Sequence, residues 1–288
     1  MTKFYIDDFK EEILLELLSK KAFGEHPEAS LKDFTFYEFN LKDLGLPSAE
    51  ELLNQVLEIK EKVSIKGWAS KGIESKNYQG FSLSYNPNFY DSSASIYHQT
   101  WGSKQLTQTY SRKIDIGTHT QTKDTYYDTY AFRKIPPIVN QHLGYFLEKF
   151  NFSLLRSRVA FFEMKGLEPR LDAPWHIDEF PYQLLRINIP LLTSEEYVLD
   201  INGQDDFGNH LKIENKHLEV GKLYIWNTRI PHRITIKSKC ISALPRIHMV
   251  LGFSPWLKYV DNDESFLYNQ YHNLPLKEIV ENKLFLKM

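Results

Sequence analysis

The spacing of apolar residues along the chain changes from a helical to an extended period near residue 150. In the first half, apolar side chains recur every three or four positions, as they do on a helix with one buried face. Ser48 and Glu51 have the spacing of a capping box at the start of one such segment, and Pro136 suits the first turn of another. We therefore expect helices over residues 7–21, 47–63 and 136–150.

From residue 156 onward, apolar and polar residues alternate, which is the period of a strand. Turn residues separate short runs that we expect to be strands, at residues 156–165, 184–192, 196–202, 211–220, 221–227, 232–238 and 246–253. Strands at this density are typical of a closed or double-sheet antiparallel β domain. One earlier strand is expected within residues 77–87, and a last helix within residues 274–286.

These patterns divide the chain into three regions. We expect a helical and polar-loop region over residues 1–150 that packs on the core and shapes the substrate side, a β core over residues 151–260, and a helical tail over residues 261–288. Within the first region, residues 91–128 are rich in Ser, Thr and Tyr and have weak periodicity. This stretch is either a surface excursion with short strands or a loop that faces the substrate.

The composition narrows the class of protein. The chain has 288 residues, enough for a sizeable core, and a formal net charge of −2 that gives no bulk attraction to nucleic acid or anionic membranes. The single cysteine, Cys240, cannot form an internal disulfide, and no apolar run approaches transmembrane length. We expect a soluble, cytoplasmic protein with no nucleic-acid partner and no membrane association.

The first candidate for chemistry is the stretch APWHIDEF. On an extended segment, His176 and Asp178 project from the same face, because residues two apart do so. His232 follows a later strand, and a closed β domain can place it against the first pair. Two imidazoles and one carboxylate form a facial set that leaves positions open and suits non-haem Fe(II).

The His-x-acid spacing is not specific by itself, since it also occurs at His26/Glu28 and His217/Glu219. The order of residues downstream favours the first candidate, because Arg246 opens the apolar run RIHMVLGF. A guanidinium that leads into a buried strand needs an anionic partner, since burying it unpaired is unfavourable. That partner is either an acidic side chain of the protein or a dicarboxylate co-substrate bound through two nitrogens.

Together, HIDEF, LLRINIPLL, GKLYIWNTRIPH and RIHMVLGF resemble the Fe(II)/2-oxoglutarate-dependent dioxygenases, over residues 150–258. The closer resemblance is to their aspartyl/asparaginyl β-hydroxylase branch, which includes some proline hydroxylases. It implies an α+β, mainly β protein with a double-stranded β-helix core of the jelly-roll or cupin type and flanking helices. It also implies His176, Asp178 and His232 as iron ligands, and Arg246 as the clamp on the far carboxylate of 2-oxoglutarate.

The resemblance implies further co-substrate contacts. Arg186 matches an arginine that contacts 2-oxoglutarate in the branch, and the alternative is a salt bridge at the barrel mouth. Asn188 stands where the branch can carry a histidine that contacts the co-substrate. His248 shares a face with Arg246, either as a polar contact to the co-substrate or as a histidine satisfied within the core. The turn residues 227–229 could face the substrate.

The implied activity is an Fe(II)- and 2-oxoglutarate-dependent oxygenase that uses O2 to hydroxylate a C–H bond and releases succinate and CO2. The expected substrate is an amino-acid-like small molecule or a peptidyl side chain. Two other classes stay open. A cupin-type metalloenzyme would keep the metal ligands and not use 2-oxoglutarate, and a non-enzymatic β-sandwich binding module would bind no iron.

Overall fold

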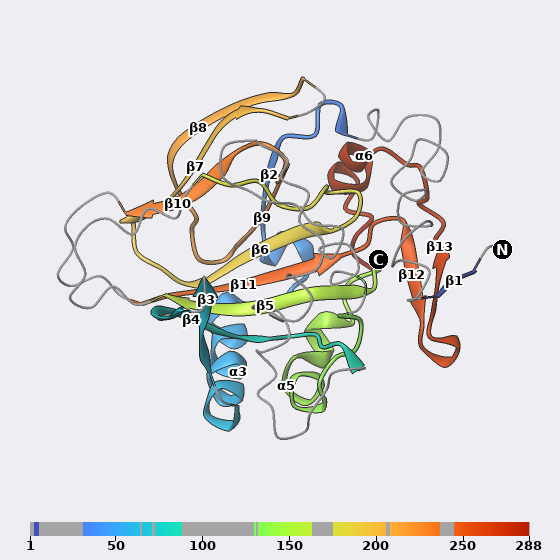
Figure 1. Cartoon of the computed structure of the whole chain (residues 1–288), viewed down its shortest axis with the longest axis horizontal. Helices are drawn as coiled ribbons and strands as arrows, with labels where there is room; N and C mark the ends of the chain where they lie inside the picture. The colour runs from blue at the N-terminus through green and yellow to red at the C-terminus, as the bar shows by residue number, and fades with distance from the viewer. Residues whose placement is uncertain are drawn as a thin grey trace.

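The structure is a computed structural model, and it describes residues 3–5, 31–63, 65–70, 73–87, 130, 132–162, 175–205, 208–236 and 245–287 (Figure 1). The helix expected over residues 7–21 and the polar stretch 91–128 fall outside these residues. Among the helices that the structure describes, none combines the length and the apolar character needed to cross a bilayer.

A seven-stranded antiparallel sheet forms the centre of the molecule, in the strand order β2-β9-β6-β11-β5-β4-β3 (Figure 1). Its strands are β2 (Phe36–Asn40), β3 (Lys66–Ser70), β4 (Ile73–Ser82), β5 (Leu154–Phe162), β6 (Leu185–Leu192), β9 (Lys222–Trp226) and β11 (Arg246–Phe253). Strands from the first 150 residues thus share one sheet with strands of the expected β core, and the division of the chain into three regions stays a prediction.

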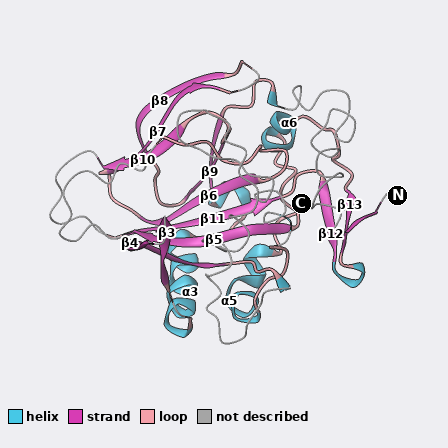
Figure 2. Ribbon diagram, in the orientation of Figure 1, coloured by secondary structure: helices cyan, strands magenta, loops and turns pink. Residues whose placement is uncertain are grey.

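A second, three-stranded sheet has the order β10-β7-β8 and consists of β7 (Tyr197–Gln204), β8 (His210–His217) and β10 (His232–Ile236). An isolated antiparallel bridge between His176 and His232 extends it by one short segment. From β5 to β11 the chain therefore passes back and forth between two antiparallel sheets (Figure 2). This is the topology of a double-stranded β-helix, and it confirms the mainly β fold with flanking helices.

Helices cover the outer face of the large sheet. They are α3 (Ala49–Lys62) and α5 (Pro137–Leu147), and α6 (Leu276–Glu281) lies near the C-terminus. The side chain of Ser48 accepts a hydrogen bond from the Glu51 amide at 3.1 Å, which confirms the predicted start of α3. The short 3-10 helices are η2 (Lys42–Leu44) and η5 (Asp261–Asp263), and a third sheet has the order β1-β13-β12, formed by β1 (Lys3–Tyr5), β12 (Leu257–Val260) and β13 (Ser265–Tyr268).

The alternation of residues did not predict β2. This strand, FYEFN, lies at the edge of the large sheet and pairs with β9 alone. Its first four residues are partly buried rather than alternating between buried and exposed. Because aromatic side chains face both sides of this edge strand, the period of two that identifies a strand with one solvated face is missing.

The two faces of the large sheet differ in chemistry. On β6 and β11, odd-numbered residues such as Ile189 and Leu251 join one apolar core with residues of α3 and α5. Even-numbered residues point the opposite way, into the space between the two sheets. These include Arg186 and Asn188 on β6 and His248 on β11, and all are largely buried. The polar side chains singled out from the sequence therefore lie on the inner face.

Candidate metal centre

His176, Asp178 and His232 converge on one point. Each offers a ligand atom, and these atoms all lie within 4.8 Å of one another. The backbones of the two histidines are paired, with the His176 amide donating to the His232 carbonyl at 3.0 Å and the His232 amide donating back at 2.9 Å. Their ring centroids are 4.4 Å apart. The spacing of the sequence motif thus corresponds to a real cluster.

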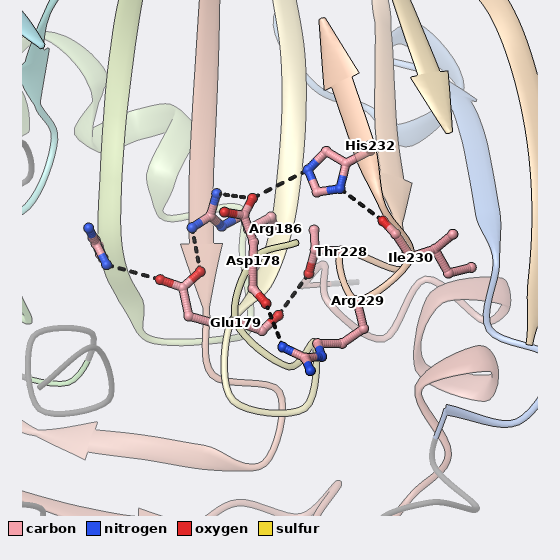
Figure 3. A network of polar contacts seen from close by, with 8 residues as sticks. Asp178, Glu179, Arg186, Thr228, Arg229, Ile230 and His232 are labelled. Atoms are coloured by element: carbon pink, nitrogen blue, oxygen red, sulfur yellow. Dashed lines mark hydrogen bonds and ion pairs between the residues drawn. The ribbon is translucent and has the colours of Figure 1, made fainter. Parts of the chain in front are cut away.

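The hydrogen bond of one ring nitrogen shows which nitrogen of His232 carries a hydrogen. Its Nδ1 lies 3.0 Å from the carbonyl oxygen of Ile230 (Figure 3). A carbonyl oxygen can only accept, so Nδ1 carries a hydrogen and donates it. The other ring nitrogen, Nε2, lies 3.4 Å from Oδ2 of Asp178. An imidazole nitrogen that faces a carboxylate oxygen needs either a proton or a metal cation between the two atoms, and His232 and Asp178 are both common metal ligands.

Hydrogen bonds fasten together the two segments that carry the candidate ligands. The Asp178 amide donates to the carbonyl of Thr228 at 2.9 Å, and the hydroxyl of Thr228 donates to the carbonyl of Glu179 at 2.8 Å. Arg229 adds a longer contact of 3.4 Å from Nη1 to the carbonyl of Asp178 (Figure 3). The geometry of the cluster is therefore set by the protein itself, which favours binding of a ligand without reorganisation.

The turn of residues 227–229 serves this fastening. All three residues are buried and have protein partners, and a contact of this turn with a substrate stays a prediction. The side-chain amide of Asn227 donates to Asp205 at 2.8 Å and to the carbonyl of Phe34 at 3.2 Å. The guanidinium of Arg229 lies 4.1 Å from the ring centroid of Phe180. The turn therefore holds β10 in register with the segment that contains Asp178.

A buried network of charges adjoins the cluster. Arg186 donates through Nη1 to Oδ2 of Asp178 at 2.6 Å and through Nη2 to Oε2 of Glu179 (Figure 3). Arg156 donates to the other oxygen of Glu179 at 2.9 Å. Burial acts to raise the pKa of both carboxyls, but the neighbouring guanidiniums, together with the two histidines in the case of Asp178, hold both pKa values below their ordinary ones.

Neither Glu179 nor Arg156 was singled out from the sequence. Two signals could have indicated them. Glu179 follows Asp178 directly, and Arg156 is the first of two arginines that alternate along the strand RSRVAFF and so share one face. For Arg186 the structure shows the salt bridge that was the alternative role. Its contact to 2-oxoglutarate stays a prediction.

Arg246 and His248 lie side by side on the inner face of β11. Arg246 is 9% exposed, and its Nη2 donates to Nδ1 of His248. Since the guanidinium only donates, Nδ1 of His248 accepts and the ring hydrogen resides on Nε2. Burial, followed by the positive charges of Arg246 and Arg158, lowers the pKa of His248 well below 6.5. The histidine is therefore neutral, and its Nε2–H group is a donor.

Several donors on this inner face lack acceptors. Within the described part of the chain, no hydrogen-bond partner exists for Nε2 of His248, Nδ2 of Asn188 or Nε1 of Trp226. On the paired strands, Asn188 lies opposite Val250, and His248 lies opposite Pro190. The two polar residues are therefore two positions apart along the strands, or about 7 Å. Buried polar groups are almost always paired. Unpaired donors beside a buried arginine are what a site for an anionic ligand contains.

No protein-family model matches the chain, and no curated protein matches it. Solved structures with a related arrangement include SnoN, an α-ketoglutarate-dependent epimerase of nogalamycin biosynthesis, at 11% identity over 82% of this chain and 83% of that chain, with a TM-score of 0.39. A prolyl-4-hydroxylase of Pseudomonas putida has 11% identity over 78% and 96% of the two chains and a TM-score of 0.35. A full-length Neurospora crassa protein solved in complex with α-ketoglutarate has 10% identity over 96% and 94% and a TM-score of 0.37. At these values the similarities define neither family nor activity, which must come from the side chains.

Proposed function

We propose that the protein is an Fe(II)- and 2-oxoglutarate-dependent oxygenase in which His176, Asp178 and His232 bind the iron. The convergence of three ligand atoms carries this proposal. One atom each of His176, Asp178 and His232 lies within 4.8 Å of the others, and Nε2 of His232 lies 3.4 Å from Oδ2 of Asp178. A set of two imidazoles and one carboxylate that leaves coordination positions open suits Fe(II) among the common protein metals. Iron in such a site supplies the activation of O2.

The unpaired donors of the inner face support a dicarboxylate as co-substrate. Arg246 can hold a carboxylate through two nitrogens, and the Nε2–H group of His248 and the amide of Asn188 are the further donors available on neighbouring strands. A neutral His248 is suited to this role, because it donates without adding a charge. The donors of His248 and Asn188 would remain unpaired in a metalloenzyme that binds no acidic co-substrate, which is why we favour 2-oxoglutarate over the cupin-type alternative.

In the proposed reaction one atom of O2 enters the product alcohol at a substrate C–H bond, and the other enters the carboxylate of succinate as 2-oxoglutarate loses CO2. The residues of this chain bind and orient the two organic molecules and keep water out of the space between the sheets. The substrate we propose is an amino-acid-like small molecule or a peptidyl side chain. This substrate class, and membership in the aspartyl/asparaginyl β-hydroxylase branch, rest on the resemblance of the sequence motifs.

The test is to add Fe(II) and 2-oxoglutarate to the purified protein without oxygen and record the visible spectrum. A weak charge-transfer band, followed by succinate release when oxygen is admitted, supports the proposal. Iron binding without the band would support the cupin-type alternative. Absence of iron binding would support the binding module.

Arg246→Ala separates co-substrate binding from metal binding. Losing a buried charged contact removes at least about 2 kcal/mol of binding free energy, so the 2-oxoglutarate concentration for half-maximal succinate release should rise about 30-fold or more. The metal dissociation constant should not change. Arg133→Ala is the matched control, because Arg133 is also buried but pairs with Tyr259 and Glu264 outside this space. An unchanged 2-oxoglutarate requirement in Arg246→Ala would contradict the assignment.

A further inference from the structure

Glu179 is a buried carboxylate next to a proposed metal ligand, yet it is not part of the ligand cluster. It is 3% exposed, and its two oxygens accept from two different arginines. Oε1 accepts from Arg156, and Oε2 accepts from Arg186, which Figure 3 shows. A carboxylate in such a place is retained only if it is paired, and here both oxygens are. The proposed reaction so far gives it no role.

The effect of Glu179 falls on Arg186. A guanidinium and a carboxylate pair most strongly when two parallel N–H groups meet the two oxygens. Here the guanidinium is divided, with Nη1 bound to Asp178 and Nη2 bound to Glu179. Because Glu179 holds Nη2, the contact from Nη1 of Arg186 to Asp178 falls on one oxygen, Oδ2. A carboxylate has about four lone-pair sites, so this geometry is compatible with a cation bound to the same group.

The charges point the same way. Asp178, Glu179, Arg156 and Arg186 together carry two negative and two positive charges in a largely buried space. Without the carboxylate of Glu179, two guanidiniums would face a single carboxylate, and the local charge would become positive. A positive surplus opposes the binding of a divalent cation a few ångströms away, where screening by water is weak.

We propose that Glu179 is a positioning residue for the metal centre, which holds Arg186 in the orientation that leaves Asp178 able to bind a divalent cation. This inference rests on the proposed function, because it takes Asp178 as a metal ligand. In this proposal Arg186 binds Glu179 and not the co-substrate, and Arg246 is the arginine that binds the dicarboxylate. Hydrogen-bonded partners of ligating residues commonly set metal affinity in this manner.

The experiment is an anaerobic titration of the metal-free protein with Co(II), read by its visible bands and independent of turnover. In Glu179→Gln the Co(II) dissociation constant should rise about 10- to 100-fold, the range for partners of ligating residues. Glu38→Gln is the matched control, because the Glu38 carboxylate also binds two cations, Lys216 at 2.7 Å and Lys222 at 2.6 Å, away from the site. Its Co(II) affinity should equal that of the wild type.

A second variant shows whether Glu179 acts through Arg186. When Arg186→Gln is present, adding Glu179→Gln should change the Co(II) dissociation constant much less than it does alone, because the competing fork is absent. Equal effects in both backgrounds would overturn the inference, as would a wild-type affinity in Glu179→Gln. If that variant does not fold, Glu179→Met, which buries no unpaired amide, takes its place. A wild type that binds no Co(II) would instead refute the proposed function itself.

Discussion

The outer and inner faces of the large sheet are built from the same strands and are similarly buried, but their chemistry is opposite. On β6, Ile187 and Ile189 are fully buried in the apolar core, and between them Asn188 is 6% exposed with an unpaired amide nitrogen. The outer face gains stability from burial, whereas the inner face gives up stability to keep donors and charges in place. Positions at which a sequence breaks a local rule in this manner are expected to be functional or strained sites.

It follows that stability and function should separate by the parity of the residue number along β6 and β11. Substitutions on the outer face should change the free energy of unfolding and leave ligand affinity unaffected. Substitutions on the inner face, and at the ligands near its end, should change ligand affinity and should not lower the free energy of unfolding as outer-face substitutions do. Variants of the two faces can therefore be set against each other.

The metal ligands should show the strongest effect. His232→Ala should abolish binding of Fe(II) or Co(II), because one of only two imidazoles of the cluster is lost. Titration of the metal-free protein measures this directly. His217→Ala is the control, since His217 belongs to another His-x-acid pair and its Nδ1 contacts the Tyr197 carbonyl at 3.3 Å instead. Metal binding at wild-type strength by the His232 variant would remove the basis of the proposed function.

The next effect compares two neighbours on one strand. Ile189→Ala should lower the free energy of unfolding by about 2–5 kcal/mol, because it leaves a cavity in the apolar core. Asn188→Leu should leave it unchanged or raise it, since the substitution removes a buried donor that lacks an acceptor. Urea unfolding of the metal-free proteins measures both. If Asn188→Leu destabilises as strongly as Ile189→Ala, the two faces do not differ as we describe.

Much of this arrangement could be predicted from local patterns. The runs LLRINIPLL and RIHMVLGF became β6 and β11, because strand periodicity is a property of neighbouring residues. The cluster of His176, Asp178 and His232 was predicted from residue types and their order. Such patterns are local enough to be read along the chain.

The charge network next to the cluster could not be predicted in the same manner. Arg156 and Glu179 are 23 residues apart and meet only because β5 and the segment after Asp178 are brought together by the fold. The partner of Arg246 was likewise open, and the structure places the ring of His248 against it. Which of several charged residues pair with one another depends on tertiary contacts that no local period records.

The weakest effect is a pH dependence that His248, on the inner face, contributes to stability. Burial and the charges of Arg246 and Arg158 lower the pKa of His248 well below 6.5, so the folded protein keeps this ring neutral while the unfolded chain protonates it. The free energy of unfolding is therefore unaffected by this ring above pH 6.5. As the pH falls below 6.5, protonation of the unfolded chain lowers it by up to about 1.4 kcal/mol per pH unit. His248→Gln keeps an acceptor for Arg246 and does not titrate, so its unfolding free energy should fall less between pH 6.5 and 5 than that of the wild type. Parallel curves for the two proteins would show that His248 titrates alike in the folded and the unfolded chain, which would contradict the lowered pKa.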